Sequence, residues 1–124
     1  MPIWRVSIKP TKLEITEFQW LKVRGYVHFK LCNYGWTRQR VSTAGYTKVG
    51  SYKLADTNIG ARLRRKSCHE VKVPFETDIL GLIRMLWEAI TTGKITVHVN
   101  LKLYGWIFSR DVSGDYTIPV EKIY

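Results

Sequence analysis

Apolar and polar side chains alternate along two long segments of the chain. In residues 21–31 every odd-numbered position is apolar or glycine, and every even-numbered position is basic, aromatic or histidine. Residues 94–104 repeat this alternation, with aliphatic side chains at the odd-numbered positions. A period of two is that of a β-strand with one buried and one exposed face. We therefore predict two long strands that cover a shared core.

Shorter runs of the same period predict further strands. Residues 4–8 alternate before Pro10, which cannot donate a backbone hydrogen bond and should end this strand, and the period resumes at Leu13. Residues 33–36 (Asn-Tyr-Gly-Trp) favour a turn, whereas residues 38–44 show no clear pattern. The other predicted strands cover residues 46–54, 59–63, 71–75, 106–109 and 116–120, with a polar loop at 110–115 between the last two.

One amphipathic helix is predicted late in the chain. Apolar residues recur there at intervals of three and four, which is the spacing of a single helical face. Thr77 or Asp78 can cap the start of this helix, and Gly93 suits a left-handed cap at its end. We expect the helix to lie across the core on a stripe formed by Ile79, Leu82, Ile83, Leu86, Trp87 and Ile90.

The order of these elements predicts a mainly β fold in a single domain over residues 1–124. Alternating strands need a second apolar layer to cover them, so we expect two packed sheets. The predicted architecture is an antiparallel β-sandwich of the immunoglobulin or fibronectin kind, with seven to eight strands and one α-helix before the last long strand.

Several local sequences lie at the positions of motifs that are typical of a known family. They are Val71-Lys72-Val73-Pro74, the helical segment 80–90, Gly93, Leu103-Tyr104-Gly105 and Ile118-Pro119. In this order the chain resembles the water stress and hypersensitive response (WHy) domain, the folded form of late embryogenesis abundant (LEA type 2) proteins. It departs from the family at Asn33, which is followed by Tyr34 instead of proline.

This resemblance implies a non-enzymatic role in the stress response, including desiccation tolerance. Such a domain would act through its surface, by binding proteins or membranes, and the resemblance implies no catalytic residues. A structural subunit of a larger assembly, such as a virus particle, is a further hypothesis for a domain of this kind.

The charge of the chain favours anionic partners. Twenty Lys and Arg against ten Asp and Glu give a formal charge of +10 and a pI of about 9.8. Nucleic acid and anionic membrane surfaces both fit this charge, although a basic surface can also serve solubility alone.

Nucleic-acid binding is therefore the alternative function. Cations neutralise phosphates and aromatic rings stack on bases, and the outward faces of the two long strands offer both. The candidate residues are Lys22, Arg24, Tyr26, Lys30, Arg62, Arg64, Arg65, Lys66 and Lys102.

The sequence lacks the common catalytic signatures. No GxGxxG, P-loop, GxSxG or HExxH motif occurs, so we predict no enzyme, no cofactor and no metal. His28 and His98 occupy equivalent outward positions on the two long strands and should be isolated, exposed imidazoles. Cys32 and Cys68 are expected to be structural, either free or joined if the fold brings them close.

The start of the chain and its apolar runs bear on location. The first residues lack the basic and apolar regions of a secretory signal, and no run of apolar residues reaches the length of a bilayer span. We therefore predict a cytoplasmic protein, with any membrane contact peripheral.

Overall fold

Eight strands and one helix follow one another in the computed structural model, which describes residues 6–19, 21–105 and 109–123. The mainly β class with one late helix is confirmed. The elements are β1 (Val6–Gln19), β2 (Lys22–Asn33), β3 (Gln39–Val49), β4 (Tyr52–Asp56), β5 (Gly60–Leu63), β6 (Ser67–Thr77), α1 (Leu80–Thr92), β7 (Lys94–Tyr104) and β8 (Ser109–Lys122).

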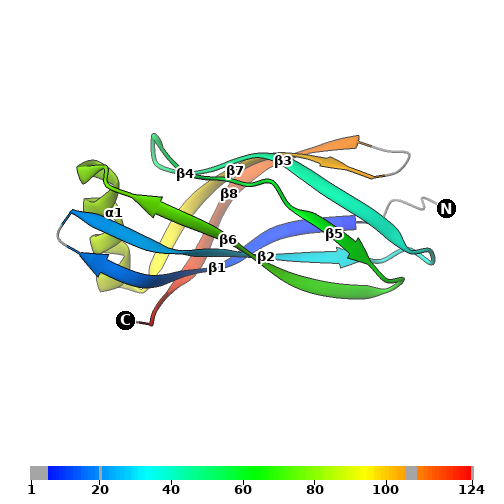
Figure 1. Cartoon of the computed structure of the whole chain (residues 1–124), viewed down its shortest axis with the longest axis horizontal. Helices are drawn as coiled ribbons and strands as arrows, with labels where there is room; N and C mark the ends of the chain where they lie inside the picture. Colours follow the sequence, from blue (N-terminus) through cyan, green and yellow to red (C-terminus); the bar gives the residue numbers. More distant parts are fainter. Residues whose placement is uncertain (1–5, 20, 106–108, 124) are drawn as a thin grey trace.

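The strands form one curled sheet in place of two separate ones. Their order is β4-β3-β7-β8-β1-β2-β6, and β5 pairs with β3. Most neighbours are antiparallel, but β1 and β8 run parallel, with Leu13 opposite Val120. The predicted antiparallel sandwich is therefore corrected to a mixed sheet shaped as a half-barrel (Figure 1). Alternation along each strand could not reveal this, because it does not encode which strands pair or in which direction.

The two long strands predicted from alternation are confirmed. Their odd-numbered side chains are buried, and Val27, Phe29, Val97 and Leu101 are at most 1% exposed. Leu21, the predicted start of the first strand, lies outside β2 and is 54% exposed. Burying each large aliphatic or aromatic side chain contributes about 1.5–3 kcal/mol, so the shared interior of these strands is a main source of stability.

Two strand boundaries differ from those predicted near the start of the chain. Pro10 does not end β1, because the register with β2 shifts between Pro10 and Lys12, and such an irregularity tolerates a residue without a backbone N–H. The segment without a clear pattern forms most of β3. The predicted strand 46–54 is broken at Gly50, whose φ of 60° allows the tight turn from β3 into β4. Trp4 lies outside the described residues.

The predicted loop at 110–115 is wrong. These residues belong to β8, which pairs with β7 from Lys94 opposite Pro119 to Tyr104 opposite Ser109. Their polar side chains lie on a largely exposed strand, so the polarity that suggested a loop reflects exposure instead. Residues 106–108 of the predicted strand 106–109 lie outside the described residues.

The helix is confirmed, with a narrower buried stripe than predicted. Its buried residues are Leu82, Ile83, Leu86 and Ala89, whereas Trp87 is 58% exposed. Gly93 forms the predicted left-handed cap, with φ 80° and its N–H donating to Ala89 O. The predicted N-cap is wrong. The cap residue is Ile79 without a side-chain bond, because Thr77 Oγ1 instead accepts a hydrogen bond from the Ile79 N–H.

The described residues contain no helix with the length and hydropathy required to cross a bilayer.

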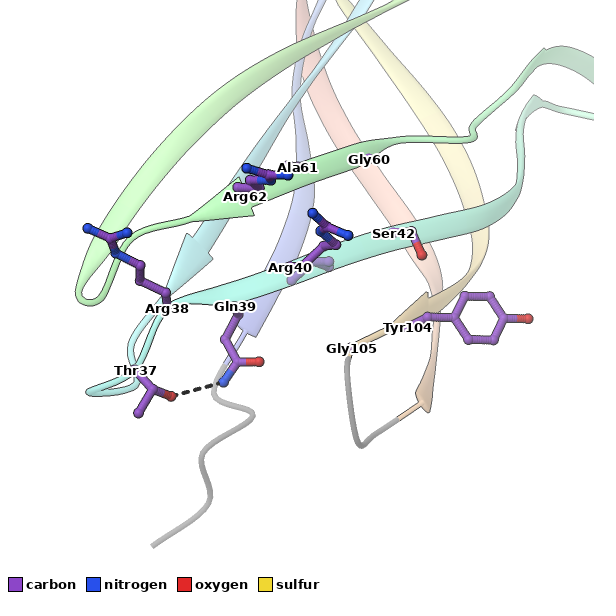
Figure 2. A pocket seen from close by; sticks show the side chains of 11 residues that line it. Thr37, Arg38, Gln39, Arg40, Ser42, Gly60, Ala61, Arg62, Tyr104 and Gly105 are labelled. Atoms are coloured by element: carbon purple, nitrogen blue, oxygen red, sulfur yellow. Dashed lines mark hydrogen bonds between the residues drawn. The ribbon is translucent and has the colours of Figure 1, made fainter.

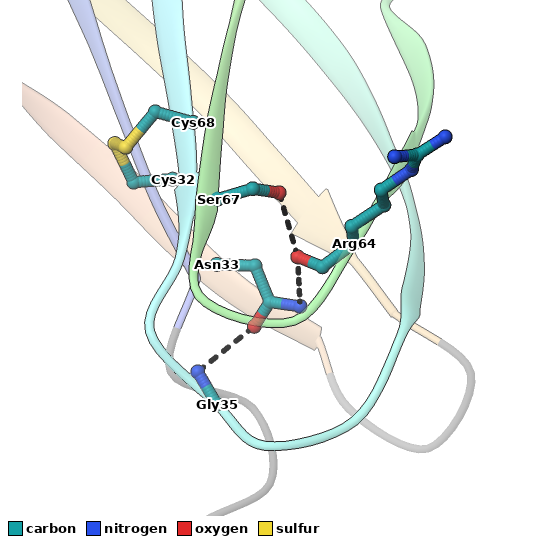
Figure 3. Close-up of a disulfide and its surroundings, with 6 residues drawn as sticks. All are labelled: Cys32, Asn33, Gly35, Arg64, Ser67 and Cys68. Atoms are coloured by element: carbon teal, nitrogen blue, oxygen red, sulfur yellow. Dashed lines mark hydrogen bonds between the residues drawn. A yellow bond between two sulfur atoms is a disulfide. The ribbon is translucent and has the colours of Figure 1, made fainter.

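The two cysteines are joined. Cys32 of β2 and Cys68 of β6 are register partners, and they form a disulfide with a Cα–Cα distance of 4.1 Å (Figure 3). Cys32 is buried, whereas Cys68 is exposed. The bond fixes the register between the C-terminal end of β2 and the N-terminal end of β6.

His28 is not the exposed imidazole that the alternation predicted. It is 4% exposed, and its Nδ1 lies 2.6 Å from Glu70 Oε1 while its Nε2 is hydrogen-bonded to Glu14. Glu14 of β1 and Glu70 of β6 lie diagonally across from His28 on the same face, within reach of the ring. His98 instead pairs with Asp115, and strands β8 and β1 separate the two histidines.

Leu86→Asp should unfold the domain, because Leu86 is 0% exposed and an unpaired carboxylate there would cost several kcal/mol, about 3–5. Thermal unfolding followed by circular dichroism measures this. Arg84→Asp, at an exposed position of the same helix, should melt close to the wild type. Equal melting temperatures for the two variants would contradict the packing of α1 on the core.

Reduction of the disulfide should lower the free energy of unfolding by about 2–4 kcal/mol, since the bond closes a long loop in the unfolded chain. Its cysteines are 36 residues apart. Urea denaturation with and without dithiothreitol measures the difference. The variant with both Cys32→Ala and Cys68→Ala should be as unstable as the reduced protein and insensitive to reductant, and a reductant effect on it would refute this origin.

Candidate functional site

Four arginines gather where β3 and β5 pair. The register places Arg40 directly opposite Arg62 and Val41 opposite Ala61. Because side chains alternate along a strand, burial of Val41 and Leu63 sends Arg40 and Arg62 to the outer surface. Arg38 precedes β3 and Arg64 follows β5, both exposed. We call Arg38, Arg40, Arg62 and Arg64 the arginine face.

The arginine face borders a surface groove of about 910 Å³ (Figure 2). A second hollow of about 490 Å³ shares Arg38, Arg40 and Arg62 with it and adds Arg64. At its far end the groove reaches Tyr104 of β7, which is the register partner of Ser42. The residues lining the groove are Thr37, Arg38, Gln39, Arg40, Val41, Ser42, Gly60, Ala61, Arg62, Tyr104 and Gly105.

Small residues keep the middle of the groove open. Ser42 faces Gly60 across the two strands, and a Cβ added at Gly60 would meet no atom within 4 Å. At the near end, Gln39 Nε2 donates to Thr37 Oγ1 at 3.1 Å, as Figure 2 shows. A ligand can therefore approach the backbone between the arginines and Tyr104.

No carboxylate of the described residues neutralises the charge of the arginine face. Among the described residues, all ion pairs involve other cations, and no aspartate or glutamate lines either hollow. Like charges directly opposite one another on paired strands destabilise a sheet. The pair Arg40 and Arg62 therefore concentrates positive potential at the groove at some cost to stability.

The buried side-chain amide of Asn33 is hydrogen-bonded to the segment before Arg38 and to Arg64 itself. Asn33 is 0% exposed, and its Nδ2 donates to the carbonyls of Thr37 at 2.8 Å and Arg64 at 3.2 Å. Its Oδ1 accepts from the Gly35 N–H at 2.9 Å, and Ser67 Oγ also donates to Arg64 O (Figure 3). This clamp, next to the disulfide, fixes the backbone on which Arg38 and Arg64 stand.

The predicted nucleic-acid residues do not form one patch. Lys22 and Arg24 lie at the N-terminal end of β2. Lys22 Nζ is 2.7 Å from Glu76 Oε1, and Arg24 Nε is 2.9 Å from Glu76 Oε2. The hydrogen bond from Lys22 lowers the pKa of the Glu76 carboxyl below its ordinary value, so this carboxylate stays charged. Tyr26, on the same strand, lies under Lys72. None of these residues lines the groove, and the cations Lys22 and Arg24 are paired with carboxylates.

Of the other predicted residues, Arg62, Arg64 and Lys102 lie at or near the groove. Arg62 and Arg64 belong to the arginine face, and Lys102 lies beside Tyr104, with 5.9 Å from Nζ to the ring centroid. Lys66, after Arg65 in the turn between β5 and β6, lies 3.5 Å above the Trp36 ring. Lys30 is exposed on β2 opposite Glu70 and is not part of the groove.

Sequence reasoning missed Arg38 and Arg40. Residues 38–44 show no clear pattern, so the sequence predicts no direction for their side chains. The signal that could have found them is spacing, because Arg38 and Arg40 repeat the two-residue interval of Arg62 and Arg64. In two strands, that interval places each pair of arginines on one face.

Comparison with known proteins gives a fold likeness alone. No family model matches the chain, and no curated protein matches it. A protein from Archaeoglobus fulgidus is 15% identical over 91% of this chain and 94% of its own, with a TM-score of 0.49. An X-ray structure from the Northeast Structural Genomics Consortium is 10% identical over 94% of this chain and 85% of its own, with a TM-score of 0.53.

Arg62→Glu should raise the free energy of unfolding by about 0.2–1 kcal/mol, because it replaces a repulsion with an ion pair opposite Arg40. Urea denaturation at low salt measures this, and the gain should shrink in high salt. Arg62→Gln should give a smaller gain, since it removes the repulsion only. A loss of stability in both variants would mean that Arg62 stabilises the sheet by other contacts.

Proposed function

We propose that this chain is a non-enzymatic binding domain that holds a polyanion against its arginine face. The observation that carries the proposal is the placement of Arg40 directly opposite Arg62, with no carboxylate among the described residues that line the groove. An arrangement that works against stability is typical of a binding site, where a ligand supplies the missing partner. An anionic ligand would remove the repulsion and so bind more tightly.

The dimensions of the arginine face favour a ligand with several negative groups. Arginines two residues apart on one strand stand about 6.6 Å apart, and opposite arginines about 5 Å. The groove of about 910 Å³ is much larger than a single phosphate or sulfate needs. Each guanidinium forms a planar fork that suits the paired oxygens of a phosphate. A chain of phosphates or sulfates can engage all four.

The chemistry of the groove supports a role in binding. Its lining contains no histidine, cysteine, aspartate, glutamate or lysine among the described residues. Arginine keeps its proton at all ordinary pH values, so it positions anions and does not exchange protons with them. Tyr104 lies at the edge of the groove.

Stress protection by a WHy-like domain is a second proposal. It is supported by the order of the elements, with α1 between the Val-Pro strand β6 and the long strand β7. Exposed apolar side chains near α1 offer a surface for partly unfolded proteins: Leu21, Ile79, Leu80 and Trp87.

The cytoplasmic location remains a prediction, and the Cys32–Cys68 disulfide bears on it. Disulfides persist in oxidising compartments, and inside cells mainly in hyperthermophiles. A cytoplasmic protein of this sequence would therefore keep the bond only in such an organism, or lose it on reduction.

Removing two arginines should weaken binding to a polyanion. The variant with Arg40→Gln and Arg62→Gln should elute from immobilised heparin at lower NaCl. Its plot of log affinity against log salt, measured with inorganic polyphosphate, should lose about one unit of slope per arginine.

The matched control removes the same charge at the other end of the molecule. Arg84→Gln with Lys94→Gln changes two exposed cations of α1 and β7, and it should bind nearly as the wild type does. Equal losses in the two double variants would mean that net charge alone governs binding, and no binding by the wild type at about 50 mM salt would end the proposal.

A further inference from the structure

Exposed aromatic rings stand at both ends of the arginine face. Tyr104, 40% exposed, closes the groove at one end, and Figure 2 shows its ring projecting outward from β7. Tyr34 and Trp36, 57% and 58% exposed, precede Arg38 in the connection between β2 and β3. Large apolar side chains are costly to leave in water, so a cluster of them marks an interaction surface.

Cations and rings alternate along this surface. Lys102 lies beside Tyr104, the arginine face follows, and Lys66 covers one side of the Trp36 ring at 3.5 Å. Sites for single-stranded nucleic acid combine these two elements, because cations follow the phosphates while rings stack on successive bases. A ligand made only of charge, such as polyphosphate, would leave the rings unused.

We propose that the groove binds single-stranded nucleic acid, with phosphates on the arginine face and an unstacked base on Tyr104. This inference rests on the proposed function, that the face binds a polyanion. Arg40 and Arg62 would hold neighbouring phosphates. Ser42, directly opposite Tyr104 on the neighbouring strand β3, places a hydroxyl between the arginines and the Tyr104 ring. The open floor at Gly60 leaves room for the sugar backbone.

A double helix fits this surface less well. Its bases are stacked on one another and offer no face to Tyr104. Direct reading of a duplex uses a projecting helix or two-stranded ribbon in the major groove. The helix α1 lies at the other end of the molecule from β5 (Figure 1), and the arginines line a hollow instead of a ridge.

A lipid surface fits less well for the same geometric reason. Lipid headgroups lie in a plane, which contacts projecting side chains before it can enter a hollow. The exposed aliphatic side chains Ile79 and Leu80, which could enter a bilayer, lie at the start of α1, at the opposite end from the arginine face.

The test compares strands that differ only in their bases. Fluorescence anisotropy measures binding of the wild type to a labelled oligothymidylate of about 12 nucleotides, and to an abasic strand with the same number of phosphates. The oligothymidylate should bind at least about 5-fold more tightly, because stacking contributes only when a base is present. An unlabelled duplex of the same length should compete less well than the single strand.

Tyr104→Ala should lose that preference. Its affinity for oligothymidylate should fall by about 5-fold or more, while its affinity for the abasic strand stays unchanged. Tyr104→Phe, which keeps the ring, should retain the preference. Because Tyr104 is exposed, both variants should fold, and their thermal melts verify this.

The outcomes separate this inference from the proposed function. Equal binding of the base-containing and abasic strands, both weakened by Arg40→Gln with Arg62→Gln, would overturn the nucleic-acid inference and leave the polyanion site intact. Equal competition by the duplex would also overturn the inference. Failure to bind oligothymidylate, the abasic strand and polyphosphate at low salt would overturn both.

Discussion

The parallel pairing of β1 with β8 joins the two antiparallel halves of this domain. Leu13 and Ile15, two of the three β1 residues in this pairing, are both 0% exposed, so the seam lies over the core. On one side β1 continues into β2 and β6, and on the other β8 continues into β7 and β3. The first and last strands therefore meet in the middle of the sheet, and the short strands β4 and β5 lie at one border of it.

Alternation and helical spacing predicted the elements that have one fully apolar face, namely β2, β7 and α1. They failed where burial and polarity do not coincide. In β3, Thr43 and Thr47 are at most 5% exposed because they hydrogen-bond to Thr57, which hides the apolar pattern. In β8 most side chains are at least partly exposed, so the strand looks like a loop. The direction of the β1 and β8 pairing is a property of distant segments, which no local period contains.

The sequence alone indicated two of the four residues of the arginine face. The run that includes Arg62 and Arg64 was evident from composition, but its partner strand was not, and the meeting of Arg40 with Arg62 depends on the register of β3 and β5. The same register brings Ser42 opposite Gly60 and opens the groove. Arginines on a short border strand also keep its free backbone groups from pairing with another chain, so one set of charges can serve binding and discourage aggregation.

The clamp at Asn33 makes the geometry of the groove depend on a single amide. Its Nδ2 donates to carbonyls from two segments, so the site needs a donor there. Hydrolysis of this side chain to a carboxylate, the common chemical ageing of asparagine, would set a negatively charged acceptor against those same carbonyls. The two segments would then repel the residue that holds them together, and the arginines would separate without any change in their own chemistry. The integrity of the arginine face therefore depends on the chemical state of one buried amide.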